Sequence, residues 1–207
     1  EKRIVQQLAE NELLIKEVHH RIRNNITSIA SLLTMQSRSV TDPAAIAILQ
    51  DAIARVGTMR VLYEKLLNSA DHVAAPVKPF VEGLVSTAAA LFPDDHGINI
   101  ATRIDDFELA SKQLFPFGII ITELLTNALK YAFVGRDGGE ILIRITRDAG
   151  LVTLTMTDDG IGLPGVADRP ASEGFGLFLV KVLSEQLDGK FVMESGGGTR
   201  SVLTFSC

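Results

Sequence analysis

The sequence contains a single cysteine, Cys207, and few basic residues for its length. One thiol cannot form a disulfide within the chain, which suits a reducing compartment such as the cytoplasm. Lys and Arg number 20 against 25 Asp and Glu, giving a formal net charge of −5. Proteins that bind nucleic acid by neutralising its phosphates are basic, so this balance argues against that class.

Long hydrophobic runs and a signal peptide are also absent. The most apolar run, Leu114 to Ile121, is too short to span a bilayer and is interrupted by Pro116. The first ten residues are charged and helix-like, unlike a signal peptide. The sequence starts without Met and already in heptad phase, so we interpret it as a fragment whose upstream sensor or membrane region is missing. Its composition, 46% hydrophobic and 22% charged, is typical of a soluble globular protein.

A helical repeat runs through the first seventy residues. Apolar residues recur at a spacing of seven with an intervening position, namely Leu8, Ile15, Ile22, Ile29, Val18 and Leu32. The pattern predicts a long amphipathic helix from about Ile4 to Ser37. Thr41-Asp42-Pro43 then supplies a cap residue and a proline at the first position of a second helix. The two helices form an antiparallel hairpin, whose wide apolar face, which includes Ile26 and Leu33, needs a partner hairpin or the following domain to cover it.

Two adjacent histidines lie in the polar sequence of the first helix. In the helical phase set by the isoleucines, His19 lies at the edge of the apolar face, whereas His20 points to solvent. An imidazole that is partly unprotonated near neutral pH is a nucleophile, and Glu17, one turn earlier, can hydrogen-bond a ring nitrogen. An ordinary pair of surface histidines is the alternative. A metal site is disfavoured, because the two side chains face different ways and no further Cys or His follows at ligand spacing.

A second domain begins after Ala74-Ala75-Pro76, where the helical pattern ends. The patterns predict helices at about 79–91, 111–133 and 176–187, and strands near 98–104, 141–147, 151–157, 190–194 and 201–205. Strands outnumber helices, and hairpins join several of them. The chain is therefore predicted to be α+β, with a second domain in which helices cover one mixed sheet.

The stretch Glu123 to Ala132 carries several polar side chains on a helix. Glu123, Asn127 and Lys130 fall in one sector at about 100° per residue, opposite an apolar side. An acid, an amide and an amine in this arrangement can hold a hydrated divalent cation through oxygen atoms and place an ammonium against phosphate. On this segment alone, the alternative is an amphipathic surface helix with solvated polar residues.

Three glycine-bearing loops interrupt the second domain, at residues 158–164, 173–177 and 196–199. Glycine lets the backbone approach a ligand closely, and a helix that begins at Gly176 offers free N–H groups to phosphate. Gly160 to Gly165 match the dinucleotide pattern G-x-G-x-x-G, but Pro164 and Pro170 are incompatible with the helix that must follow. We therefore reject a Rossmann site. Taken singly, each loop is also explained as a plain turn.

Together the segments resemble the sensor histidine kinases of bacterial two-component systems, in the subgroup whose phosphoacceptor helix reads His-Arg-x-x-Asn. That motif is carried by His20-Arg21-Ile22-Arg23-Asn24. The resemblance implies a dimerisation and phosphotransfer hairpin over residues 1–72, which forms a four-helix bundle in a dimer. It also implies a catalytic ATP-binding domain of the Bergerat (GHKL) type, an α/β sandwich, over residues 76–207.

The resemblance further implies roles for single residues. The phosphoacceptor is His20, with His19 as the alternative, and Glu17 is the base or orienting residue, because Arg21 stands where commoner kinases have an acid. Glu123 is expected to be catalytic and a further magnesium ligand. The ATP-binding residues are Asn127 as magnesium ligand, Lys130 near the phosphates, Tyr131 near the nucleotide, Asp158 as acceptor for the adenine amino group, Gly160 and Gly162 beside it, Gly174, Gly176 and Leu177 beside the triphosphate, and Thr199 over the adenine. The segment between Pro164 and Gly174 is then the ATP lid.

The implied function is autophosphorylation of a histidine from Mg-ATP, followed by transfer of the phosphoryl group to an aspartate of a response regulator. We expect a homodimer, with a monomer as the alternative, and a cytoplasmic kinase core that is either free or attached to a membrane through a missing N-terminal region. Two other functions stay open: an ATPase or serine kinase with the same nucleotide domain, and a scaffold that senses nucleotide. Acid-labile phosphate on the protein would separate the histidine kinase from both.

Overall fold

The computed structural model describes residues 21–22, 24–43, 45–46, 48–50, 52–53, 55–57, 60, 74–90, 97–163 and 171–207, with only the backbone described for 171–175. The chain divides into two compact units, Glu1–Asn68 and Ser69–Cys207. No helix in the described ranges is long and apolar enough to cross a lipid bilayer.

The described residues of the first unit are helical except for 40–42. One helix includes residues 21–22 and 24–39, and the described positions from 43 to 60 belong to a second. Residues 40–42 connect the two, and the backbone N–H of Ile46 donates to the carbonyl of Asp42 at 3.0 Å. Asp42 thus accepts the first hydrogen bond of the second helix, and Pro43 is its first residue, as Thr41-Asp42-Pro43 predicts.

The first helix carries apolar side chains on two adjacent faces. Ile26 and Leu33 are half-buried. Ile22, Ile29 and Leu32 of the seven-residue repeat are exposed, Ile29 to 50% and Leu32 to 62%. We call these three residues the exposed stripe. A single chain therefore leaves part of the predicted apolar face open to solvent.

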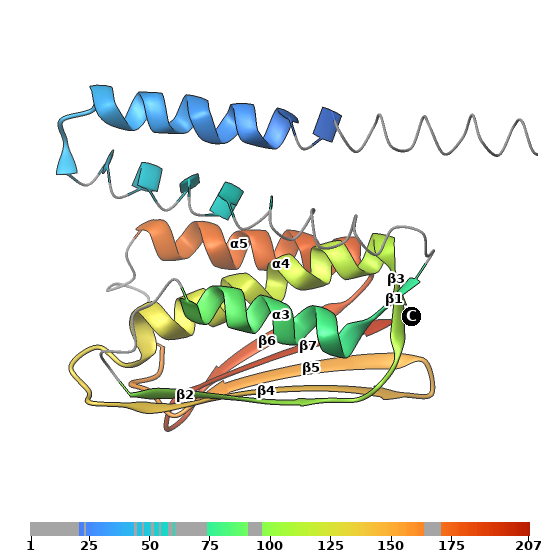
Figure 1. The fold of residues 1–207 in the computed structure, drawn as a ribbon. Coiled ribbons are helices and arrows are strands. Elements are labelled where there is room, and N and C mark those ends of the chain that lie inside the picture. Colours follow the sequence, from blue (N-terminus) through green and yellow to red (C-terminus); the bar gives the residue numbers. More distant parts are fainter. Residues whose placement is uncertain are drawn as a thin grey trace, which may run out of the picture. The chain divides into compact units, whose positions relative to one another are not determined.

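The second unit is a two-layer α+β sandwich (Figure 1), which confirms the predicted fold class. Its sheet has the strand order β2-β4-β5-β7-β6, where the strands are β2 (Ile98–Ile104), β4 (Gly139–Asp148), β5 (Leu151–Asp158), β6 (Lys190–Ser195) and β7 (Thr199–Ser206). β2 and β4 run parallel, and the other neighbours are antiparallel. The helices α3 (Val77–Ala90), α4 (Ser111–Asn127) and α5 (Ala171–Gln186) lie on one face of this sheet (Figure 1).

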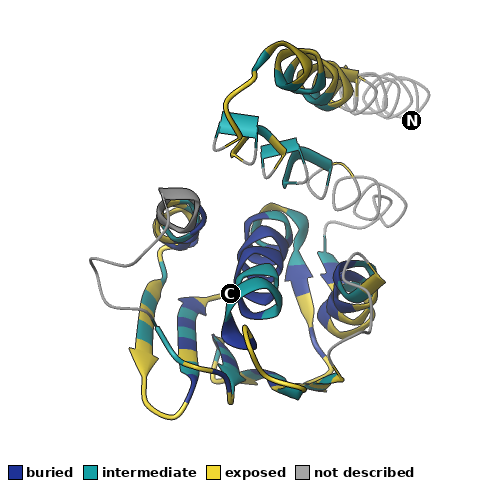
Figure 2. Cartoon of the chain, turned by 90° about the vertical axis from the view of Figure 1, so that its left-hand side faces the viewer, coloured by how far each residue is buried: buried dark blue, intermediate teal, exposed yellow. Residues whose placement is uncertain are grey.

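Alternation along the strands decides which face the helices cover. On β4 and β5 every second residue is buried, for example Ile143 and Leu154, whereas the intervening residues such as Arg144 are exposed or half-buried. The buried residues gather between the helices and the sheet, with α4 in the middle of the helical layer (Figure 2). Phe117 of α4 packs on Phe205 of β7 with ring centroids 5.3 Å apart. This core holds α4 against the sheet.

The predicted helix over 111–133 is regular only as far as Asn127. It continues as a π-helical turn, η1 (Ala128–Ala132). The carbonyl of Ala132 accepts a hydrogen bond from the N–H of Ile161 at 2.8 Å, and a Cβ on Gly160 would lie 2.3 Å from the same oxygen. These contacts hold the end of the helix against the loop after β5. They join segments that are distant in the sequence, so the local pattern of residues 111–133 does not predict them.

The helix predicted to start at Gly176 starts earlier, at Ala171. Gly176 is therefore buried inside α5, and the prediction that it opens a helix with free N–H groups is wrong. Ala, Ser and Glu precede it and are compatible with a helix, and a glycine costs a helix only about 1 kcal/mol. Two strands were not predicted, β1 (Ala74–Pro76) and β3 (Glu108–Ala110), which pair antiparallel. Three residues are too few to show an alternating pattern.

Candidate functional site

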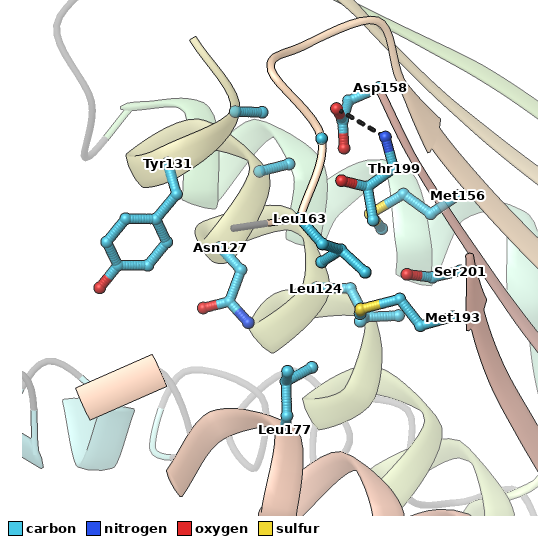
Figure 3. Close-up of a pocket in the computed structure, with 13 residues that line it drawn as sticks. Leu124, Asn127, Tyr131, Met156, Asp158, Leu163, Leu177, Met193, Thr199 and Ser201 are labelled. Carbon is cyan, nitrogen blue, oxygen red and sulfur yellow. Dashed lines mark hydrogen bonds between the residues drawn. The ribbon is translucent and has the colours of Figure 1, made fainter. Parts of the chain in front are cut away.

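A pocket opens in the second unit beside the end of α4 and the strands β5, β6 and β7 (Figure 3). Its empty space, including the part open to solvent, is about 520 Å³. The residues that line it are Leu124, Asn127, Ala128, Tyr131, Ala132, Met156, Asp158, Gly162, Leu163, Leu177, Met193, Thr199 and Ser201.

One wall of the pocket is a single face of α4 and η1. The residues of this wall stand at positions i, i+3, i+4, i+7 and i+8, namely Leu124, Asn127, Ala128, Tyr131 and Ala132. The two alanines are small, so this wall leaves space between the helix and the sheet. A flat ligand would fit there.

The three polar side chains predicted to share one sector of this helix do not all reach the pocket. Asn127 lines the pocket, but Glu123 is only 6% exposed and does not, and Lys130 is half-buried outside the lining. The prediction of an exposed Glu123 is wrong because α4 is the central helix, packed between α3, α5 and the sheet. Lys130 lies in the π-helical turn, where the angle per residue differs from that of an α-helix.

Asp158 ends β5, and two backbone donors hold its carboxylate. The N–H groups of Gly160 and Thr199 donate to Oδ1 at 3.0 and 3.1 Å, the second of which is drawn in Figure 3. Within the described part of the chain, Oδ2 has no hydrogen-bond partner. A carboxylate oxygen fixed in this way is a strong acceptor for a ligand N–H.

The loops that carry Asp158 and Thr199 are packed too closely for a side chain at Gly198. This glycine has φ +124°, and a Cβ there would lie 1.9 Å from the carbonyl oxygen of Asp158. Ser195 adds a link, because its hydroxyl accepts the N–H of Leu163 at 3.0 Å. Close packing and this hydrogen bond therefore hold the described part of the loop after β5 against the β6–β7 hairpin.

A second group of contacts ties Asp159 to the segment after η1. The guanidinium of Arg136 donates to the Asp159 carbonyl, and the N–H of Glu140 donates to Asp159 Oδ1 at 2.7 Å. A Cβ on Gly139 would lie 2.0 Å from the Phe133 ring, so this approach requires glycine. The position of the Asp158 loop is thus set from both sides.

Six of the residues predicted to bind nucleotide line the pocket, namely Asn127, Tyr131, Asp158, Gly162, Leu177 and Thr199. Gly160 adjoins it and donates to Asp158, and Gly176 is inside α5. Gly174 belongs to the part of α5 described only by its backbone. The predicted phosphotransfer residues Glu17, His19 and His20, and positions 164–170 of the predicted lid, lie outside the described residues.

The apolar walls were not singled out from sequence. Met156 of β5 and Met193 of β6 both pair with Ser201 of β7, so these three residues form a row across the sheet. Strand alternation signals that each points to the helical side. It does not signal that they meet, because that depends on the strand order.

Among the described side chains, no group of three or more His, Cys, Asp or Glu could hold a metal ion.

Two family models match the chain. The model described as "Histidine kinase" matches residues 17–92, and the model described as "Histidine kinase-, DNA gyrase B-, and HSP90-like ATPase" matches residues 115–207. The second match contains every residue that lines the pocket, the strands β4 to β7 and most of α4. The second unit is thus an ATPase-type domain of the class shared by histidine kinases, DNA gyrase B and HSP90.

Relatives extend the match over both units. Sensor histidine kinase PdtaS of Mycobacterium tuberculosis (strain CDC 1551 / Oshkosh) is 30% identical over 201 residues, covering 93% of this chain and 38% of that protein. Blue-light-activated histidine kinase 2 of Erythrobacter litoralis (strain HTCC2594) is 27% identical over 188 residues, covering 88% and 54%. The chain therefore spans between 38% and 54% of the length of these curated relatives.

A solved structure agrees in fold. The histidine kinase domain from the Erythrobacter litoralis EL346 blue-light activated histidine kinase superimposes with a TM-score of 0.66 at 22% identity, covering 86% of this chain and 95% of that one. The two family models lie in the predicted order along the chain. The chain belongs to the sensor histidine kinases, as its sequence resemblance predicts.

Proposed function

We propose that the chain is the core of a sensor histidine kinase that phosphorylates its own His20 from ATP and passes the phosphoryl group to an aspartate of a response regulator. The observation that carries the proposal is the pocket of the second unit, where a carboxylate with one fixed and one unengaged oxygen faces apolar walls. The family match of both units supports the same function.

Adenine suits the chemistry of this pocket. Its ring is flat and weakly polar, and side chains such as Met156, Met193 and Leu163 provide apolar walls. Its exocyclic amino group is a hydrogen-bond donor, for which Asp158 Oδ2 is the acceptor. In the proposed complex Oδ1 keeps its two backbone donors, so the carboxylate needs no rearrangement to bind the base.

The phosphates are proposed to lie toward Asn127 and Lys130. Asn127 offers an amide oxygen to Mg²⁺ from the pocket lining. The carboxylate of Glu123 is a second proposed ligand, but it is buried outside the lining and would have to turn toward the ion. Bound with ATP, Mg²⁺ supplies charge neutralisation on the phosphate oxygens during transfer. The ammonium of Lys130 adds positive charge nearby. Most ligands of the ion would come from phosphate and water, because the described residues hold no cluster of three acidic or imidazole side chains.

In the proposed transfer, an unprotonated ring nitrogen of His20 attacks the γ-phosphorus of ATP. The new N–P bond forms as the bond from phosphorus to the bridging oxygen breaks, and ADP leaves. Glu17 orients the imidazole or accepts its other ring proton. An aspartate oxygen of the response regulator then attacks the phosphorus, the N–P bond breaks, and the histidine is regenerated.

The assembly we propose is a homodimer in the cytoplasm, built through the first unit. The exposed stripe of Ile22, Ile29 and Leu32 supports this, because a second hairpin would remove these side chains from water. The two helices of each chain would together form a four-helix bundle.

Autophosphorylation with γ-labelled ATP and Mg²⁺ tests the proposal. The unsubstituted chain and His19→Ala should take up acid-labile label, and His20→Ala should take up none. If only His19→Ala lost the label, the phosphoacceptor would be His19 and not His20. Acid-stable label would identify a hydroxyl target and a serine kinase. ATP hydrolysis or binding with no label on the protein would leave an ATPase or a nucleotide-sensing scaffold.

A further inference from the structure

Ser201 is a buried polar residue without a partner, and it lies in the pocket. It is 5% exposed, and among the described residues its hydroxyl has no hydrogen bond. The other buried hydroxyls differ: Thr122 and Ser184 donate to the carbonyls of Gly118 and Val180, at 2.9 and 2.6 Å. In Figure 3 the Ser201 oxygen points into the pocket, toward the side of Leu163 and Leu124.

The surrounding pattern makes this hydroxyl an exception. The inner face of β7 runs from Phe205 through Leu203 to Ser201, and the first two are fully buried in the core. Leu203 pairs with Leu154 and Phe191, so that row of the sheet is apolar throughout. The next row places Ser201 between Met156 and Met193. An apolar residue would continue the core there, and a hydroxyl between two thioethers gains nothing from the protein.

A buried hydroxyl without a partner is disfavoured unless something else satisfies it. In this pocket the missing hydrogen-bond partner is a ligand, because the Ser201 oxygen points into the space that a ligand would occupy. We infer that Ser201 is a specificity-determining residue of the nucleotide site, whose hydroxyl donates a hydrogen bond to a ring nitrogen of the bound base. The inference rests on the proposed function, since it assumes that ATP is the ligand.

Asp158 and Ser201 then recognise different parts of the base. The Asp158 carboxylate only accepts, so it selects an amino group, and the Ser201 hydroxyl donates to an unprotonated ring nitrogen. Adenine has both an exocyclic amino group and unprotonated ring nitrogens. Guanine has a carbonyl in place of the adenine amino group. This carbonyl would face the Asp158 carboxylate, and because both groups only accept hydrogen bonds they would repel each other. The two residues together favour adenine over guanine.

The test measures ATP binding by calorimetry in the whole chain with Mg²⁺. Ser201→Ala should raise the Kd for ATP about two- to tenfold, the usual contribution of one hydrogen bond. Ser201→Cys, which keeps the shape and has only a weak donor, should change it in the same direction. Ser184→Ala is the matched control, because it removes a buried serine hydroxyl that does not line the pocket, and its Kd should equal that of the unsubstituted chain.

Deaza analogues of ATP identify the partner atom. In 1-deaza-, 3-deaza- and 7-deaza-ATP one ring nitrogen is replaced by C–H. The analogue that lacks the bonded nitrogen should bind the unsubstituted chain more weakly, and Ser201→Ala should weaken it no further. The other two should lose the same factor as ATP on that substitution. The thermal unfolding temperature of Ser201→Ala without nucleotide should be equal or higher, because the substitution removes an unsatisfied hydroxyl.

The outcomes separate the two proposals. If the unsubstituted chain binds ATP and Ser201→Ala binds it equally well, the inference is wrong and the proposed function stands. If Ser201→Ala weakens ATP and all three analogues by one common factor, the hydroxyl does not contact a ring nitrogen, and the inference is again overturned. If the unsubstituted chain binds no ATP, the proposed function fails and the inference fails with it.

Discussion

Asp158 serves the fold with one carboxylate oxygen, and we propose that it binds a ligand with the other. Its Oδ1 accepts N–H groups from two loops, whereas Oδ2 has no protein hydrogen bond in the described part of the chain. The backbone donors therefore orient the carboxylate before any ligand arrives. This preorganisation is what a binding site needs, because the ligand does not have to order the side chain.

Asp158→Asn is expected to weaken ATP binding about 10- to 100-fold, since a hydrogen bond to a charged group contributes about 1.5–3 kcal/mol. The amide can keep an oxygen for the N–H groups of Gly160 and Thr199, so the unfolding temperature should change little. Calorimetry and thermal denaturation measure the two effects. Asp148→Asn, at the other end of the β4–β5 pair, is the control and should bind ATP normally. Equal affinity in both variants would contradict the role given to Asp158.

At the scale of elements, the pocket depends on how two strand ends are joined. β5 and the β6–β7 hairpin meet where Gly198 has no room for a side chain and where Ser195 bonds the N–H of Leu163. The neighbouring Gly197 has φ +67° but open space around it. The same hairpin therefore contains one glycine required by close packing and one required only by its backbone angle.

Gly198→Ala is expected to lower the free energy of unfolding by about 2–4 kcal/mol, because overpacking and a strained backbone angle add together. It should also weaken ATP binding, since the Thr199 N–H that holds Asp158 must move. Gly197→Ala is the matched control and should cost about 1 kcal/mol, with normal ATP affinity. Urea denaturation gives both stabilities from the transition midpoints. Equal losses in the two variants would argue that the close approach has no energetic importance.

At the scale of the whole molecule, we propose separate tasks for the two units. All residues that line the pocket belong to the second unit, and the exposed stripe belongs to the first. A change on the stripe should therefore alter assembly without altering the affinity for ATP. The division makes the proposed homodimer testable apart from nucleotide binding.

Ile29→Asp is expected to convert a dimer into a monomer, because a charge would have to be buried in the interface without a partner. Ser31→Asp is the control on the same helix: Ser31 is exposed, lies away from the stripe, and its hydroxyl donates to the carbonyl of Thr27 at 3.0 Å. Size-exclusion chromatography with light scattering should give a dimer for Ser31→Asp and the unsubstituted chain. A monomeric unsubstituted chain would refute the proposed assembly, and the Kd for ATP should be the same in all three.

Much of this protein was determined by its sequence alone, because the relevant signals are local. Alternation located the strands of the large sheet and their inner faces, and Thr41-Asp42-Pro43 located the start of a helix. The order of elements led to the α+β class and to the family. The loop that begins at Asp158 was singled out because carboxylates and glycines after a strand are visible within a few residues, whereas the role predicted for Asp158 came from the family resemblance.

Other features were decided only by the tertiary structure. The burial of Glu123 follows from the central place of α4, and the end of the π-helical turn is held by the hydrogen bond from Ile161 to Ala132. Met156, Ser201 and Met193 form one row because β7 lies between β5 and β6. Periodicity in a sequence reports which way a side chain points, but not which distant segment it meets. The pocket needed both, since Asp158 and Thr199 lie at the ends of strands that only the strand order brings together.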